Sequence, residues 1–138
     1  MAATPGGHGY WEVRSDGGVF AFGDAKSYGS TGAIHLTRDI IGITASADGK
    51  GYWLVAADGG VFAFGDAVFA GSTGGFSLVA PIIGMIRNPV GPGYWLAAAD
   101  GGMFGFGGAP WKGSIPQIQQ FTGPTFTLHS PIVAIAAK

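Results

Sequence analysis

A 42-residue repeat constrains this chain more than any other feature of its sequence. A 17-residue motif occurs three times with few changes: GYWEVRSDGGVFAFGDA at 9–25, GYWLVAADGGVFAFGDA at 51–67 and GYWLAAADGGMFGFGGA at 93–109. The three copies begin 42 residues apart, at Gly9, Gly51 and Gly93. A fixed period of about 20 to 50 residues is typical of repeat architectures, in which each unit buries its apolar faces against its neighbours.

The repeat divides the chain into one domain with three units and a closing segment. We place the repeats at about 1–39, 40–81 and 82–130, and a closing strand at 131–138. The third repeat is longer, because Pro131 follows Pro81 by 50 residues. The segment PIVAIAAK (131–138) resembles the opening of a fourth repeat, and residues 1–9 supply the turn that should follow such a strand. We therefore expect this strand to complete the first unit of its own chain or of a partner.

Within each repeat the local signals favour strands. A helix needs about a dozen residues with little glycine, and this chain contains 27 glycines. Apolar runs flank Asp58-Gly59-Gly60, and an Asp-Gly pair between such runs predicts a hairpin with a tight primed turn, because glycine adopts positive φ. The β-branched run PIIGMIR adds a strand before the hairpin, and the looser tail of each repeat predicts a weaker fourth.

Both faces of the predicted hairpin are apolar. Trp53 and Val55 share one face, and Tyr52 and Leu54 share the other. A sheet with this pattern must be covered on both sides, as a propeller blade is. The sequence therefore predicts an all-β, β-propeller-like fold with three 42-residue blades of about four antiparallel strands, and a β-trefoil is the alternative. Since natural propellers have about four to eight blades, we expect a homodimer that closes a six-bladed ring.

Recurring aromatic and acidic positions are assigned structural roles. The aromatic residues expected in the structural core are Trp11, Trp53, Trp95, Phe20, Phe62 and Phe104. Three aspartates precede a Gly-Gly pair, namely Asp16, Asp58 and Asp100. A ring of carboxylates could hold a cation, but aspartate before glycine is typical of a turn residue that binds its own backbone. We therefore interpret these aspartates as turn residues.

The tandem unit PI(I/V)GI…GYWLVAADGGVFAFGDA…YGSTG resembles repeats of secreted and cell-wall-associated proteins of actinobacteria, which often occur beside peptidoglycan-directed enzymes. It is also similar, more distantly, to the chromosome-condensation-regulator propeller repeat, through AIAA (134–137), GYWLVAADGGVFAFG and the segment 28–32. The resemblance implies propeller blades and an extracellular or cell-wall location. Residues 1–11 show no signal-peptide pattern. No activity is implied, because propellers host many functions.

The best ligand-site candidates lie near the start of the insertion. Trp111 occupies the position of Ser27 and Phe69 in the other repeats, and Lys112 follows it. Apolar ring faces beside amide donors suit a sugar, and the insertion supplies such amides. The predicted ligand-binding residues are Trp111, Lys112, Tyr28 and Gln117. Trp111 could equally form a contact between subunits.

Composition excludes several function classes. A formal net charge of −1 with 11% charged residues gives no basic surface for nucleic acid or an anionic membrane. The chain has no cysteine, its three histidines lie at unrelated repeat positions, and Glu12 is its only glutamate, so we expect no metal, no cofactor and no enzymatic activity. We expect a non-enzymatic binding module, lectin-like for carbohydrate or a cell-envelope polymer; the alternative is a purely structural self-assembling repeat protein.

Overall fold

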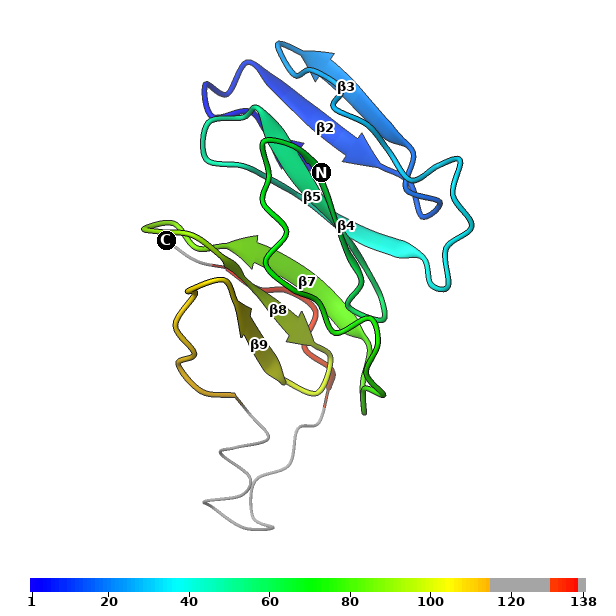
Figure 1. Cartoon of the computed structure of the whole chain (residues 1–138), viewed down its shortest axis with the longest axis vertical. Helices are drawn as coiled ribbons and strands as arrows, with labels where there is room; N and C mark the ends of the chain where they lie inside the picture. The colour runs from blue at the N-terminus through cyan, green and yellow to red at the C-terminus, as the bar shows by residue number, and fades with distance from the viewer. Residues whose placement is uncertain (115–129, 137–138) are drawn as a thin grey trace.

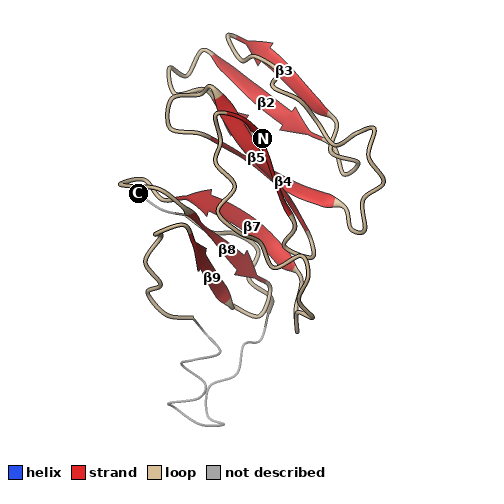
Figure 2. Ribbon diagram, in the orientation of Figure 1, coloured by secondary structure: helices blue, strands red, loops and turns tan. Residues whose placement is uncertain are grey.

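The computed structural model describes residues 1–114 and 130–136, and within them it contains three antiparallel sheets and no helix (Figures 1 and 2). The first sheet consists of β1 (Ala2–Ala3), β2 (Gly9–Val13) and β3 (Val19–Gly23). The second consists of β4 (Ile40–Ala45), β5 (Gly51–Ala56) and β6 (Val61–Gly65). The third consists of β7 (Ile82–Arg87), β8 (Tyr94–Ala98) and β9 (Met103–Phe106). The predicted all-β class and tandem repeated units are confirmed.

The glycine turn of each hairpin is one residue longer than predicted. Between β2 and β3, the N–H of Gly17 donates to the Arg14 carbonyl at 2.8 Å, and the N–H of Arg14 donates to the Gly18 carbonyl at 2.9 Å. Within this turn, Gly17 alone has positive φ, at 82°. A two-residue primed turn of the predicted kind would need a positive φ at its first central residue, so this connection is a three-residue loop with glycine in the left-handed position.

Three sheets of three strands replace the predicted blades of about four. Residues 24–39 and 66–81 form loops, and some of their backbone groups bind side chains instead of pairing in a fourth strand. The indole Nε1 of Trp11 donates to the Lys26 carbonyl at 2.7 Å, and the N–H of Tyr28 donates to the Tyr52 hydroxyl at 3.0 Å. Gly29, at φ 133°, further prevents an extended strand in the first loop.

Alternate residues of the second sheet face opposite neighbours. We call the side with Tyr52 and Leu54 the tyrosine face, and the side with Trp53 and Val55 the tryptophan face. The tyrosine face packs in one apolar core with Trp11 of the first sheet, and the tryptophan face packs in another core with residues of the third sheet. The expected covering of both sheet faces is therefore present at the middle sheet.

The sheets converge at their first strands and diverge at their last. Cα atoms of β4 approach those of β1 and of β7 within 8 Å. Within the described strands, no such approach occurs between β3 and β6 or between β6 and β9. Figure 1 shows the three sheets following one another along the long axis of the molecule. The array is thus a fan of sheets with β1, β4 and β7 at its narrow side.

Two of the predicted core residues are corrected by their position at the ends of this fan. Phe20 is 47% exposed, because it lies on the tyrosine face of the first sheet and no other described sheet covers that face. Trp95 is only half-buried, because it lies on the tryptophan face of the third sheet and no other described sheet covers that face. Trp11 and Trp53, by contrast, are buried between sheets. The half-buried pair Phe62 and Phe104 packs against the two apolar cores.

Candidate functional site

Trp111 lies at the outer edge of the third sheet beside an open cleft. Its indole Nε1 donates to the Met103 carbonyl on β9 at 3.1 Å, which fixes the ring beside the last strand. The ring is 50% exposed. The adjoining cleft has a volume of about 700 Å³ and lies between the loop 73–80 and β9. Trp111 therefore combines a fixed orientation with an accessible face.

The lining of this cleft is aromatic with a few polar groups. Phe76, Phe104 and Phe106 line it together with Trp111, and Ser77 and Ser114 contribute hydroxyl groups. Aromatic faces bordered by hydroxyl groups can stack on the apolar side of a sugar ring and bind its hydroxyls. The arrangement suits binding rather than proton transfer.

The carboxylate in the same cleft is already engaged. Asp100 accepts the N–H of Gly102 at 2.9 Å. The same contact recurs at the equivalent positions of the other hairpins, where Asp16 accepts from the N–H of Gly18 at 2.8 Å and Asp58 accepts from the N–H of Gly60 at 2.9 Å. Each aspartate stabilises its own turn in this way.

The structure does not bring all four predicted ligand residues together. Tyr28 lies between the first and second sheets, where its hydroxyl donates to the Gly49 carbonyl at 3.2 Å and its ring meets Tyr52 edge-on at 5.8 Å. It is therefore a packing residue remote from the Trp111 cleft, since it belongs to the other apolar core. Lys112 is exposed next to Trp111 but does not line the cleft. Gln117 lies outside the described residues.

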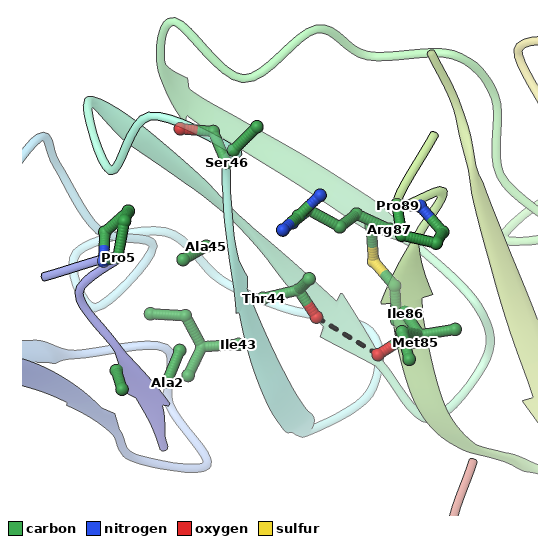
Figure 3. Close-up of a pocket in the computed structure, with 12 residues that line it drawn as sticks. Ala2, Pro5, Ile43, Thr44, Ala45, Ser46, Met85, Ile86, Arg87 and Pro89 are labelled. Carbon is green, nitrogen blue, oxygen red and sulfur yellow. Dashed lines mark hydrogen bonds between the residues drawn. The ribbon is translucent and has the colours of Figure 1, made fainter. Parts of the chain in front are cut away.

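A second hollow at the narrow side of the fan was not predicted. This groove, of about 370 Å³, is bounded by β1, β4 and β7 and by the residues that follow them (Figure 3). Its lining includes the small side chains of Ala2, Ala3, Ala45 and Ala47. The hydroxyl of Thr44 donates to the Met85 carbonyl at 3.1 Å, which links β4 to β7. Arg87 is the charged residue among those that line it. The sequence contains no repeated signal for this groove, because the positions of Ala2 and Ala3 are Ile86 and Arg87 in the third repeat.

The turn after β4 contains a carboxylate with a shifted pKa. Asp48 accepts the backbone N–H of Lys50 at 3.0 Å, and the hydroxyl of Ser46 donates to it at 3.1 Å. The bond from the Lys50 backbone, foremost among several hydrogen bonds, lowers the pKa of the Asp48 carboxyl. These bonds hold Asp48 as a charged turn residue.

Buried tyrosine hydroxyls join neighbouring sheets. The hydroxyl of Tyr94 accepts the N–H of Ala70 at 3.1 Å and donates to the Gly71 carbonyl. Tyr52 makes the same pair of bonds one repeat earlier, with the N–H of residue 28 and the carbonyl of residue 29. We call each N–H and carbonyl pair a tyrosine socket. Burial raises the pKa of Tyr94, although the two socket bonds oppose this shift.

The described residues contain neither a metal-binding cluster nor a helix that could span a membrane. Within residues 1–114 and 130–136, no three His, Asp or Glu side chains gather closely enough to hold a metal ion. The described part of the chain also contains no helix with the length and hydropathy required to cross a membrane. No protein-family model, curated protein or solved structure matches this chain.

Proposed function

We propose that this chain is a non-enzymatic, lectin-like module that binds a carbohydrate or cell-envelope polymer in the Trp111 cleft. The observation that carries the proposal is the half-exposed Trp111 ring, held by its bond to Met103 over a cleft lined by further aromatic rings. A rigid aromatic platform gives apolar contact at a small cost in conformational entropy. Binding is expected on this rim and not within the sheets.

The repeats also support an accessible Trp111 in an assembled protein. Phe69 is the equivalent residue one repeat earlier, and the next sheet is already docked beside it through the bond from Ala70 to Tyr94. Phe69 nevertheless remains 56% exposed. A sheet docked beside Trp111 in the same manner would leave its ring similarly open to a ligand.

We further propose that two copies form a six-bladed β-propeller. The convergence of β1, β4 and β7 supports blades arranged around an axis. The two separate apolar cores, one on either side of the middle sheet, favour this arrangement over a β-trefoil, whose three units surround one common core. Through the resemblance to actinobacterial repeats, the proposal includes an extracellular or cell-wall location.

A purely structural, self-assembling protein is the second candidate. It is favoured by the exposed rings of Tyr10, Phe20 and Phe22 at the free face of the first sheet. Exposed apolar patches of this kind are typical of interaction surfaces. Both candidates use the same assembly, and only the first requires a ligand.

Binding to cell-envelope polysaccharides tests the first candidate. Cosedimentation with insoluble cell-wall polymer and a glycan array would compare the wild type, Trp111→Ala and the repeat-matched control Phe69→Ala. We expect Trp111→Ala to weaken binding about tenfold or more, the equivalent of about 1.4 kcal/mol, and Phe69→Ala to bind normally. An absence of wild-type binding would favour the structural candidate, and equal losses in both variants would overturn the Trp111 site.

A further inference from the structure

The first sheet begins with an incomplete strand. β1 pairs only Ala2 with Trp11 and Ala3 with Tyr10. In the second sheet the corresponding strand, β4, has six residues, of which Thr44 and Ala45 occupy the positions of Ala2 and Ala3. The part of the strand that corresponds to residues 40–42 is therefore missing beside the end of β2, and Met1, at the position of Ile43, does not pair.

The segment 131–136 occupies the position of this missing part, but beside the third sheet. The N–H of Ile132 donates to the Ala99 carbonyl at 2.8 Å, as Ile40 does to Ser15 and Ile82 does to Ala57 at the same distance. A Cβ added to Gly84 would lie 3.1 Å from Cγ2 of Ile135. The segment thus lies where a fourth sheet would begin, with no second strand beside it in the described residues.

β1 and the segment 131–136 cannot pair with each other within one chain. The second sheet lies between the first and the third, and each of its faces is already covered. The pairing of Ile82 with Ala98 and of Gly84 with Ala97 sets the register for a joint between two copies. By repeat equivalence, Ile132 would lie opposite Arg14 of a second copy, and Ala134 opposite Val13.

A vacant tyrosine socket lies at the same end of the chain. Residues 112 and 113 follow the socket of Tyr94 by one 42-residue repeat, and Gly113 has a φ of 113°, near the 135° of Gly71. Of the three repeat-equivalent tyrosines, Tyr10, Tyr52 and Tyr94, Tyr10 is the one that binds no socket among the described residues: it is 39% exposed and stacks on Phe22 at 5.1 Å. Phe106, the equivalent of Phe22 in the third sheet, lies over Gly71 of the socket that Tyr94 binds.

We propose that the third sheet of one copy docks the first sheet of a second copy, with 131–134 supplying the first part of the strand that ends at Ala2 and Ala3. Tyr10 of the second copy then binds the N–H of Lys112 and the carbonyl of Gly113. This inference rests on the proposed self-assembly and specifies its interface. The occupant is a second copy because the joint uses the same repeat positions as the two interfaces inside the chain.

One residue makes this joint weaker than the internal ones. Glu12 stands on the tyrosine face where the other sheets have Leu54 and Leu96, both fully buried. A carboxylate at this position opposes burial against the apolar face of the third sheet. The interface therefore dissociates more readily than the sheets within one chain, and Glu12→Leu is expected to tighten dimerisation about tenfold or more.

Engineered disulfides test the register, because the chain has no cysteine of its own. Full-length Val13→Cys and Ala134→Cys proteins would be mixed and oxidised, with Val133→Cys in place of Ala134→Cys as the matched control. We expect covalent heterodimers from the first mixture and few from the control, since adjacent strand residues point to opposite faces. Equal yields, or none from the first mixture, would overturn the proposed register.

Light scattering over a dilution series separates this inference from the proposed self-assembly. We expect Ile132→Asp to weaken the dimer strongly, and Val133→Asp, at an exposed neighbour, to leave it intact. A wild-type dimer whose stability is unchanged by Ile132→Asp and by Glu12→Leu, and whose cysteine pair forms no disulfide, would overturn the interface. The proposed self-assembly would then still stand. A wild-type monomer at every concentration would overturn both, and glycan binding would be judged separately by Trp111→Ala.

Discussion

Removing the Tyr94 hydroxyl measures how much the bonds in a tyrosine socket contribute to the free energy of unfolding. Tyr94 has no exposed surface, and its hydroxyl accepts from Ala70 and donates to the Gly71 carbonyl. Tyr94→Phe keeps the ring and leaves both backbone groups without that partner. A buried polar group left unpaired costs about 1–3 kcal/mol. Because Ala70 and Gly71 are both half-buried, water reduces the penalty for each of these two backbone groups, and we expect a total loss of about 2–3 kcal/mol.

Urea unfolding followed by circular dichroism and tryptophan fluorescence would measure this loss. The matched control is Tyr10→Phe, studied in dilute solution, because the Tyr10 hydroxyl has no partner among the described residues of its own chain. We expect the control to change the free energy of unfolding by less than about 0.5 kcal/mol. Equal effects of the two substitutions, or a loss below about 0.5 kcal/mol for Tyr94→Phe, would refute the view that the sockets stabilise the array.

Three further predictions follow from burial, turn geometry and ionisation. Trp53→Ala should destabilise the chain by about 3–5 kcal/mol in urea unfolding and Trp95→Ala by clearly less, since only the first ring is buried between two sheets. Asp58→Ala should cost about 0.5–1.5 kcal/mol by the same assay, through loss of its bond to Gly60. Burial raises the pKa of Tyr94 above 10.0, so the stability that its protonated form contributes is complete below about pH 10 and is lost as the pH rises through the higher folded-state pKa. Unfolding curves recorded at increasing pH above about 10 should show this loss, and Tyr94→Phe should reduce it.

Much of the fold was predictable because its elements are local. The strands flanking Asp58-Gly59-Gly60 pair as expected, since their contacts involve residues close in sequence. The fourth strand was predicted wrongly, because the loop after Gly23 uses its backbone to bind Trp11 and Tyr52 of other strands. Propensity alone gives no indication of such bonds between distant residues.

The candidate site was predictable only in part. Trp111 stood out because it breaks the repeat, and the structure places it at the rim of a cleft. Tyr28 was assigned to the same site, yet it packs against Tyr52, because its loop crosses from one sheet to the next. The groove along β1, β4 and β7 was missed, since it exists only where three repeats converge.

The sequence by itself determined the period, the hairpins and the division of each strand into two apolar faces. Those properties depend on residue spacing and on glycine at Gly17 and its equivalents, and both act over a few residues. Only the tertiary structure decided which faces are covered. Phe20 and Phe62 occupy identical repeat positions, yet Phe20 is exposed and Phe62 packs into a core, because burial depends on whether a neighbouring sheet is present.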